Sequence, residues 1–148
     1  MTNYREKLLP GPMIFVMSAL VIPAALLVFL PINLEVGVVV AAVLYVAVVF
    51  LLIVGSPRIE VTETHLIAGR AKLPLANVGE TKGFIGAEAT QERGPRLDAR
   101  AWLVIRGWIQ PVVRITLDDP HDPTPYWLVS TRHPSDLIAA LVSARAKV

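Results

Sequence analysis

The chain has 148 residues, of which 54% are hydrophobic and 18% are charged, with no cysteine and a net charge of +2. A mean hydropathy of +0.57 is too apolar for an ordinary soluble domain, in which roughly 25% of residues are charged. This composition excludes intrinsic disorder and a free cytosolic enzyme as descriptions of the whole chain. The lack of cysteine excludes disulfides, thiolate metal sites and a thiol nucleophile.

Two long uncharged stretches lie near the N-terminus. Glu35 is the only charged residue between Lys7 and Arg58, and it separates the stretches Met13 to Leu30 and Val36 to Val54. At a rise of about 1.5 Å per residue, each stretch reaches roughly 27–28 Å as a helix, close to the thickness of a hydrocarbon core. The connector combines proline, asparagine and glutamate and predicts a tight turn. The stretches therefore predict a transmembrane helical hairpin. The alternative for the first stretch is a cleaved signal peptide, although a second span follows at once.

Single residues inside these spans predict local geometry. Pro23 lacks a backbone donor, so it should free the carbonyl of Ala19 and kink the first helix. Gly37 and Ala41 are small residues four positions apart, which favours close packing within the hairpin and hints at dimerisation. Neither span contains an ionisable residue at membrane depth, which argues against a transporter or a charged ion path.

Positive charge flanks the hairpin at both ends. Arg5 and Lys7 precede the first span, Arg58 follows the second, and the connector contains neither Lys nor Arg. The positive-inside rule therefore predicts that both termini are cytoplasmic. The expected divisions are a cytoplasmic N-terminus (1–12), a transmembrane hairpin (13–56) and a cytoplasmic β-rich domain (57–148).

Alternating polar and apolar residues predict short strands after position 57. The expected strands are 58–62, 65–69, 71–75, 81–85, 100–108, 112–117 and 126–131, of which the first two form a hairpin and the third, with its proline, lies at an edge. Residues 86–97 are polar, contain Gly and Pro, and predict an irregular loop. The core candidates on these strands are Leu103, Ile105, Val113, Ile115 and Leu117.

A helix is expected at the C-terminus, because Pro134 suits a first helical turn and apolar residues then recur at helical spacing. This stripe comprises Leu137, Ile138, Leu141 and Val142. The element order predicts a membrane α-helical hairpin plus an α+β cytoplasmic domain. In that domain, a small antiparallel β-sheet or partly open barrel, pleckstrin-homology-like (PH-like), is capped by the C-terminal helix. The PH-like comparison is a fold-level analogy and assigns no function.

Arginine and tryptophan alternate on the strand expected near position 102. Arginine binds phosphate and tryptophan favours the wet boundary of a bilayer, so this pattern suits a lipid headgroup region. The alternatives are binding of a protein partner, or tryptophans covered by the helix or loop with the arginines in ion pairs. The candidate partner or lipid face comprises Arg100, Trp102, Arg106, Trp108 and Arg114.

The densest polar cluster lies between the last two expected strands. Its candidate docking residues are Asp118, Asp119, His121, Asp122, Tyr126 and Trp127. Three prolines stiffen this segment, so a rigid turn is one interpretation and partner docking is another. Its carboxylates and imidazole suit a hard divalent cation, but their spacing matches no calcium or zinc motif.

Recognised catalytic motifs do not occur in the sequence: it has no nucleophile elbow, phosphate-binding loop, zinc-protease motif or dinucleotide fingerprint. We expect no catalytic residue, metal or cofactor. Residues 57–148 carry 12 Lys and Arg against 10 Asp and Glu, too small an excess to predict nucleic-acid binding. The preferred hypothesis is a non-enzymatic, membrane-anchored accessory or scaffold module that docks a membrane-protein partner, another copy of itself or anionic lipid. The rival is a metal-dependent membrane-bound hydrolase that uses the segment from Asp118 to Asp122.

Several short motifs together resemble an uncharacterised actinobacterial family of two-span membrane proteins. They are Tyr4-Arg5-Glu6, Leu66-Ile67-Ala68-Gly69, Leu73-Pro74, Arg93-Gly94-Pro95, Asp98-Ala99-Arg100-Ala101, the segment Asp118 to Trp127, and Ser130-Thr131-Arg132-His133-Pro134. The family is a domain of unknown function. The resemblance therefore implies a bacterial plasma membrane location and no particular activity.

Overall fold

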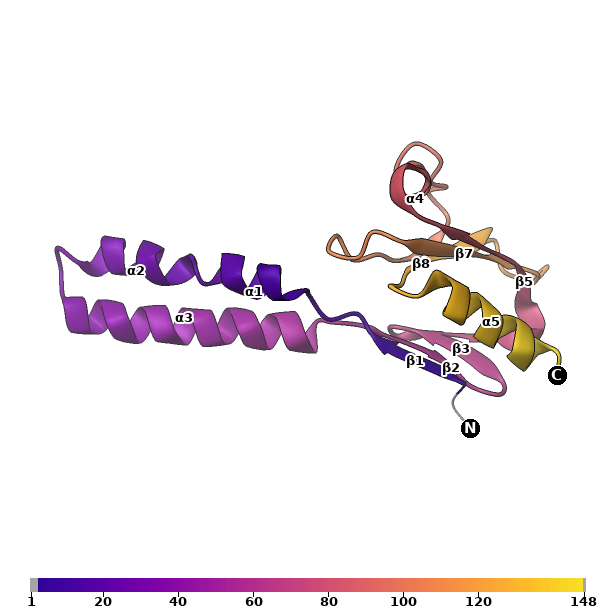
Figure 1. Ribbon diagram of the computed structural model, residues 1–148, viewed down its shortest axis with the longest axis horizontal. Helices are drawn as coiled ribbons and strands as arrows, with labels where there is room; N and C mark the ends of the chain where they lie inside the picture. Colours follow the sequence, from indigo (N-terminus) through magenta and orange to yellow (C-terminus); the bar gives the residue numbers. More distant parts are fainter. Residues whose placement is uncertain (1–2, 148) are drawn as a thin grey trace. The chain divides into compact units, whose positions relative to one another are not determined.

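The computed structural model describes residues 3–147, which form two compact units. The helical unit comprises residues 9–56, and the β-unit comprises residues 3–8 together with 57–147 (Figure 1). A separate cytoplasmic N-terminus was expected over 1–12. In the structure, residues 3–8 belong to the same folded unit as residues 57–147.

The helical unit contains three helices, and the first expected span is divided in two. The helices are α1 (Pro12–Ser18), α2 (Val21–Phe29) and α3 (Leu34–Val54). The break falls at Ala19 and Leu20, as expected four residues before Pro23, which cannot donate to the Ala19 carbonyl. That carbonyl instead accepts the Ile22 N–H at 3.0 Å. The predicted interruption by Pro23 is confirmed.

The connector begins α3 by a side-chain cap. Asn33 Oδ1 accepts the backbone N–H groups of Glu35 at 2.9 Å and Val36 at 3.2 Å. Asparagine is a favoured N-cap because its oxygen satisfies amides that lack a helical partner. The Glu35 carboxylate lies in the first turn of α3, where the helix dipole favours negative charge.

Both arms of the helical unit are long and apolar enough to cross a membrane. Pro12–Phe29 has 18 residues and a hydropathy of 2.4, and Leu34–Val54 has 21 residues and a hydropathy of 3.1. In the 18-residue apolar window of each arm, only 6% of the first and 11% of the second are buried. A core helix of a soluble protein would be mostly buried, so these arms instead present apolar side chains outward.

Small residues lie where α2 and α3 pack together. Ala25, Gly37 and Ala41 are the buried residues of these two helices. A Cβ atom added at Gly37 would lie 2.9 Å from Phe29 Cβ, closer than two carbon atoms normally approach. The predicted role of Gly37 and Ala41 in packing within the hairpin is therefore confirmed.

Gly37→Val is expected to separate α2 from α3, because the new Cβ must displace the Phe29 Cβ rather than a mobile side-chain end. Overpacking of this kind costs about 1–3 kcal/mol. The measurement is the midpoint of SDS-induced unfolding followed by helical circular dichroism. Gly11→Val is the matched control, because nothing lies within 4 Å of a Cβ added at Gly11. Equal midpoints for the two variants would contradict this packing.

One sheet of the β-unit is a four-stranded antiparallel meander in the order β1-β2-β3-β4. Its strands are β1 (Tyr4–Lys7), β2 (Arg58–Val61), β3 (His65–Ala68) and β4 (Ala71–Pro74). The expected β2–β3 hairpin and the edge position of the Pro74 strand are confirmed. β1 was not predicted, and it pairs along its whole length with β2, from Tyr4 opposite Val61 to Lys7 opposite Arg58.

The second sheet has the order β5-β7-β8-β6. A short 3-10 helix, η1 (Leu75–Asn77), leads into its strands, which are β5 (Val78–Phe84), β6 (Trp102–Val104), β7 (Val112–Leu117) and β8 (Tyr126–Ser130). The expected antiparallel pairing is confirmed for the other described strand pairs of both sheets, whereas β6 runs parallel to β8. The strand expected over 100–108 is reduced to three residues. The two sheets are not joined into a closed barrel by the strand pairs of residues 3–147.

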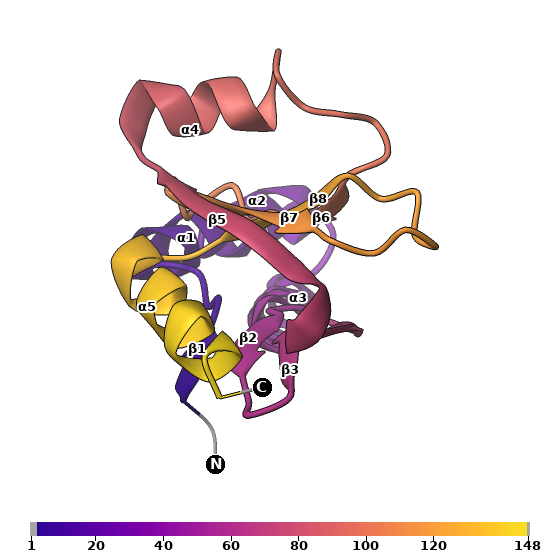
Figure 2. The same cartoon turned by 90° about the vertical axis from the view of Figure 1, so that its right-hand side faces the viewer.

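The segment predicted as a loop over 86–97 contains a helix, α4 (Gly86–Arg93). Gly86 has φ of +56°, a conformation that glycine adopts without strain and that reverses the chain after β5. α4 covers the outer face of the second sheet (Figure 2). Its buried residues are Ala89 and Glu92, so no apolar stripe marked the helix in the sequence.

The C-terminal helix α5 (Pro134–Arg145) contacts strands of both sheets and fills one side of the space between them (Figure 2). Its buried residues are Leu137, Leu141 and Ala144, whereas Val142 is exposed. The shared core includes Val113 and Ile115 as predicted, and Ile105 and Leu117 are partly buried. Leu103 is exposed while its neighbour Val104 is buried, because β6 is too short to continue the expected alternation.

Candidate functional site

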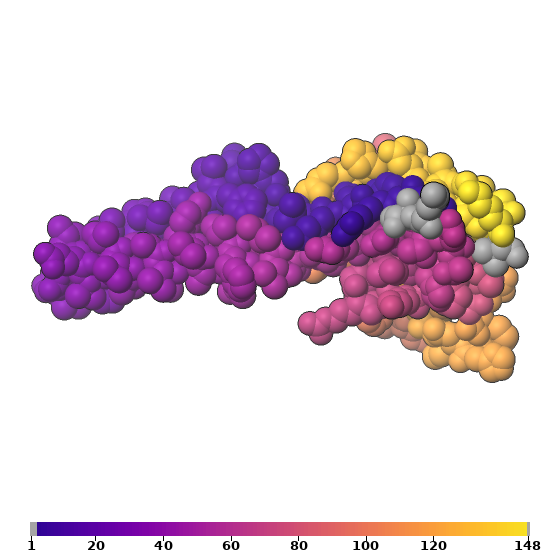
Figure 3. Space-filling view, turned by 90° about the horizontal axis from the view of Figure 1, so that it is seen from below, coloured from indigo at the N-terminus to yellow at the C-terminus, as the bar shows by residue number. Residues whose placement is uncertain are grey.

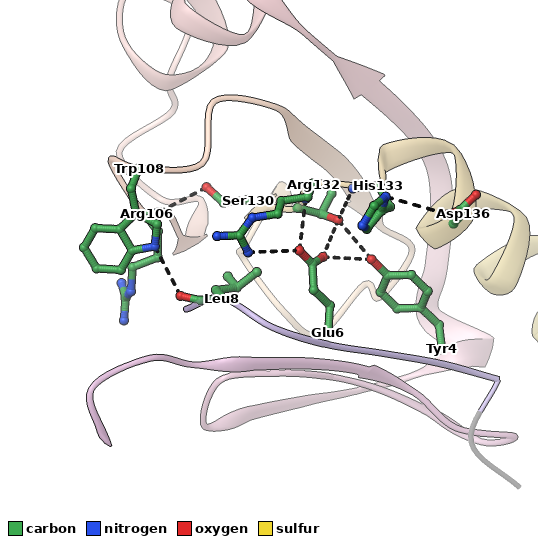
Figure 4. Close-up of polar contacts among 10 residues, drawn as sticks. Tyr4, Glu6, Leu8, Arg106, Trp108, Ser130, Arg132, His133 and Asp136 are labelled. Atoms are coloured by element: carbon green, nitrogen blue, oxygen red, sulfur yellow. Dashed lines mark hydrogen bonds and ion pairs between the residues drawn. The ribbon is translucent and has the colours of Figure 1, made fainter. Parts of the chain in front are cut away.

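A densely bonded polar cluster joins β1 to the residues between β8 and α5 (Figure 4). We call it the Glu6 cluster; it comprises Tyr4, Glu6, Thr131, Arg132 and His133. The Glu6 side chain is 10% exposed. Its Oε2 accepts the Tyr4 hydroxyl at 2.8 Å and the Thr131 hydroxyl at 2.6 Å. Its Oε1 accepts the Arg132 N–H at 3.1 Å and lies 3.6 Å from the Arg132 guanidinium.

Local sequence explains how these groups meet. Tyr4 and Glu6 are two residues apart on β1, so their side chains share one face of the strand. Thr131 directly follows β8, and its Oγ1 accepts the His133 N–H at 3.1 Å. This local turn precedes Pro134, which begins α5. β1 lies at the surface of the β-unit beside α5 (Figure 3), and the Glu6 cluster therefore fastens the strand there.

The Tyr4 phenol remains a hydrogen-bond donor over the physiological range. Burial raises the pKa of Tyr4, and the hydrogen bond and charge of Glu6 raise it further, while the Thr131 hydroxyl acts in the opposite direction. A buried phenolate beside a carboxylate would be disfavoured by desolvation and by repulsion. The Glu6 cluster is thus organised around one negative charge, with neutral hydroxyls and a guanidinium as its partners.

This pKa shift predicts the alkaline behaviour of the β-unit. The folded-state pKa of Tyr4 lies above the unfolded value of about 10, so its contribution to stability is present below pH 10 and is lost as the pH rises beyond it. Tyr4→Phe should be less stable than the parent at neutral pH but lose less stability above pH 10. The measurement is urea unfolding at a series of pH values. Equal alkaline slopes for Tyr4→Phe and the parent would contradict the assignment.

The Glu6 cluster uses both carboxylate oxygens to join β1 to the residues between β8 and α5. Both carboxylate oxygens accept protein donors, and the Thr131 hydroxyl donates to Glu6. His133 Nδ1 lies 4.0 Å from Asp136 Oδ2, too far for a hydrogen bond that would orient the imidazole.

Both ends of the helical unit attach to the β-unit at one place. Leu8, which is fully buried, donates its N–H to the Pro57 carbonyl at 3.0 Å. The Leu8 carbonyl accepts the indole Nε1–H of Trp108 at 3.2 Å (Figure 4). The Gly69 N–H bonds the Arg58 carbonyl at 2.8 Å, so the β3–β4 turn lies beside them. We call this region the attachment end of the β-unit.

The five residues of the candidate partner or lipid face do not share one strand face. Trp102 is exposed on β6, and its ring centroid lies 6.1 Å from that of Trp127. Trp108 lies outside β6 and packs against the core at the attachment end. The Arg106 N–H bonds Ser130 Oγ at 3.0 Å. Whether any of these residues binds a partner or lipid stays a prediction.

The other two arginines of that set form ion pairs in different settings. Arg100 lies in a turn and donates to both oxygens of Asp98, at 3.2 and 3.0 Å. These hydrogen bonds lower the pKa of Asp98. Arg114, on β7, donates to Glu92 Oε2 at 3.0 Å. The alternative interpretation of these two arginines, that they pair with carboxylates, is therefore confirmed.

Glu92 is a buried carboxylate that the sequence reasoning missed. Its side chain is only 2% exposed, and Arg96 lies 3.5 Å from Oε1 in addition to Arg114. The Arg114 guanidinium also lies 5.3 Å from the Phe84 ring centroid and 5.6 Å from that of Tyr126, within range of cation–π attraction. This cluster ties α4 to the outer face of the second sheet.

The candidate docking loop is a self-bonded turn. Asp119 Oδ1 accepts the His121 N–H at 2.9 Å, while its Oδ2 accepts the Asn77 amide at 2.9 Å. Asp122 Oδ1 accepts the Thr124 N–H at 2.8 Å, and hydrogen bonds from the Thr124 side chain and backbone lower the pKa of Asp122. The backbone N–H of Asp118 donates to Asn77 O at 2.8 Å. Within residues 3–147, no three His, Asp or Glu side chains lie close enough together to hold a metal ion.

The two aromatic residues next to this loop face the protein. Trp127 is buried in the core. The Tyr126 hydroxyl accepts the Asp98 N–H at 2.8 Å. Their polar and apolar surfaces are thus engaged within the β-unit, and docking through them stays untested.

A family model described as "Protein of unknown function (DUF3093)" matches residues 3–141. The chain therefore belongs to this family. The match extends from β1 into α5 and includes the helical unit and both sheets. Comparisons with curated proteins and with solved structures found no match.

Proposed function

We propose that the protein is a two-span integral membrane protein of the bacterial plasma membrane, in which the β-unit is a cytoplasmic accessory or scaffold module that docks a partner at the membrane. The pairing of β1 with β2 carries this proposal. These strands immediately precede and follow the helical unit, so both ends of that unit leave the same folded body. A chain whose two ends return to one sheet must cross a bilayer an even number of times.

The pairing also bears on the alternative of a cleaved signal peptide. Cleavage after the first span would remove β1, with the buried side chain of Leu8 and the carboxylate of Glu6. The sheet with the order β1-β2-β3-β4 would lose its edge strand β1. The hydrogen bonds of Glu6 with Tyr4 and Thr131 would be lost as well. The fold therefore favours retention of the N-terminal segment in the mature protein.

Dimensions and charge support the orientation. At about 1.5 Å per residue, the 18 and 21 residues of the two arms reach roughly 27 and 32 Å, close to the thickness of a bilayer core. Arg5, Lys7 and Arg58 lie beside the attachment end, whereas the connector has no Lys or Arg. By the positive-inside rule, this charge distribution supports a cytoplasmic β-unit.

The scaffold part of the proposal rests on how the polar side chains are used. Glu6 and Glu92 accept hydrogen bonds from protein donors, and Asp119 and Asp122 bond within their own loop. The hydrolase alternative would require acidic side chains to converge on a metal ion, and within residues 3–147 no three His, Asp or Glu side chains lie close enough together to do so. Two sheets with a C-terminal helix also support a PH-like architecture by analogy, and that architecture serves both lipid and peptide binding.

Cysteine labelling tests the anchor, because the parent chain contains no cysteine. Ile32→Cys places a thiol in the exposed connector, and Glu88→Cys places one on the exposed side of α4. In spheroplasts, a membrane-impermeant maleimide should label Ile32→Cys at once and Glu88→Cys only after permeabilisation. Equal labelling of both, or release of the full-length protein by carbonate washing, would overturn the anchor.

Crosslinking mass spectrometry in native membranes tests the docking role. We expect a stoichiometric protein partner, a second copy of the chain, or lipid linked to the cytoplasmic side of the β-unit. Two results together would overturn the scaffold role: recovery of the protein without any crosslinked partner, and no preference of the full-length protein for anionic over neutral lipid. Neither result would contradict the membrane anchor.

A further inference from the structure

Short linkers restrict where the attachment end can lie. Only residues 9–11 separate Leu8 from α1, and only residues 55–56 separate α3 from Pro57. At about 3.6 Å per residue for an extended chain, these linkers reach at most about 14 and 11 Å. If the helical unit spans the bilayer, the attachment end therefore lies within the reach of the headgroup layer, whatever the orientation of the β-unit.

Three cations gather at this end. Lys7 and Arg58 are directly opposite each other across β1 and β2. Arg70 follows Gly69, whose N–H bonds the Arg58 carbonyl and whose φ of +65° turns the chain into β4. Arg58 and Arg70 are exposed and Lys7 is partly exposed. In the part of the chain that the structure describes, none of the three forms an ion pair.

The Lys7–Arg58 pair is unfavourable within the protein alone. Residues directly opposite on antiparallel strands have Cβ atoms about 5 Å apart, and like charges at that distance destabilise the pair. The next pair on the same face of these strands, Arg5 opposite Glu60, combines opposite charges. The excess positive charge is thus confined to the last pair before the helical unit, where an external anion would remove the repulsion.

We propose that Lys7, Arg58 and Arg70 form a binding surface for the phosphate groups of anionic phospholipids, which holds the β-unit against the inner leaflet. This inference rests on the proposed membrane anchor and specifies which surface of the β-unit meets the lipid. Guanidinium groups bind phosphate through paired hydrogen bonds. The indole of Trp108, fixed to the Leu8 carbonyl, belongs to the residue type enriched at membrane interfaces.

A matched pair of double variants tests this surface. Arg58→Gln/Arg70→Gln removes two cations from the attachment end. Arg145→Gln/Lys147→Gln removes two exposed cations from the end of α5. The Arg145 guanidinium donates to the Gly79 carbonyl of β5 at 3.4 Å, in the second sheet, whereas Arg58 lies on β2 in the first sheet. Both variants change the net charge equally.

The experiment titrates phosphatidylglycerol or phosphatidylcholine into the full-length protein in a non-ionic detergent and counts bound lipids by native mass spectrometry. A cation near an anionic surface strengthens association roughly fivefold. We therefore expect Arg58→Gln/Arg70→Gln to bind phosphatidylglycerol at least about tenfold more weakly, while the α5 variant stays within about twofold of the parent. Phosphatidylcholine binding should not change in either. The single variant Arg70→Glu, in the turn outside the strands, should bind phosphatidylglycerol more weakly than Arg70→Gln.

Two results would overturn the proposal: equal weakening by both double variants, or equal affinity of the parent for the two lipids. Inorganic phosphate at millimolar concentration should not displace phosphatidylglycerol, and displacement would reassign the surface to a soluble phosphate compound. Labelling of Ile32→Cys in the Arg58→Gln/Arg70→Gln background separates the two proposals. Unchanged labelling together with a lost preference for phosphatidylglycerol would show that the membrane anchor does not depend on the lipid-binding surface. Changed labelling would show that the anchor itself has failed.

Discussion

Glu6→Ala is expected to lower the free energy of unfolding of the β-unit by about 3 kcal/mol. The carboxylate is 10% exposed and accepts three hydrogen bonds, from the Tyr4 hydroxyl, the Thr131 hydroxyl and the Arg132 N–H. Each hydrogen bond to a charged group contributes about 1.5–3 kcal/mol, and its loss leaves donors without a partner where water has limited access. The three losses are not additive, because the donors share one acceptor.

The measurement for Glu6→Ala is urea unfolding of the full-length protein in detergent, followed by tryptophan fluorescence. All three tryptophans, Trp102, Trp108 and Trp127, lie in the β-unit, so the signal reports that unit. Glu80→Ala, at an exposed position of β5, is the control and should change stability by less than about 0.5 kcal/mol. Equal unfolding midpoints for the two variants would show that the Glu6 cluster does not hold β1.

Elements governed by local rules were predictable from the sequence. The two apolar arms follow from the thickness of a bilayer core, and the break before Pro23 follows from one missing amide. The β2–β3 hairpin and the edge strand with Pro74 follow from alternation and from the missing proline donor. In each case the information lies within a few residues of the element.

Elements that depend on distant partners were missed. β1 has four residues, Tyr-Arg-Glu-Lys, without apolar alternation, and its pairing partner β2 lies beyond the whole helical unit. α4 buries Ala89 and Glu92 rather than an apolar stripe, so its composition resembled that of a loop. The alternating pattern around position 102 predicted a strand that continues past Val104. Because β6 ends at Val104, the arginines and tryptophans of the expected face do not lie on one strand.

The Glu6 cluster could not be predicted either, because its residues also come from distant parts of the sequence. Glu6 and Thr131 are 125 residues apart in the sequence, and no spacing rule connects them. The sequence did contain one relevant pattern, since Tyr4 and Glu6 alternate with Arg5 and Lys7 as residues on the two faces of a strand would. That pattern becomes informative only when the partner strand is known.

Arg114→Leu is expected to destabilise the β-unit by about 3 kcal/mol, because it leaves the Glu92 carboxylate without its nearest cation. The Glu92 side chain is 2% exposed, and Arg114 lies 3.0 Å from it. Removal of one partner from a buried ion pair typically costs about 3–5 kcal/mol. The expected value lies at the low end because Arg96, 3.5 Å from the other oxygen, still offsets part of the charge.

Arg100→Leu provides the matched control for this second prediction. Arg100 and Asp98 are also 3.0 Å apart, but the Asp98 side chain is 33% exposed, and exposed ion pairs contribute at most about 1 kcal/mol. The double variant Arg114→Leu/Glu92→Leu should regain most of the stability lost in Arg114→Leu, because two apolar residues leave no buried charge. Urea unfolding of the four proteins measures these differences. Equal losses in Arg114→Leu and Arg100→Leu, or no recovery in the double variant, would show that burial of Glu92 does not determine the strength of this contact between α4 and the second sheet.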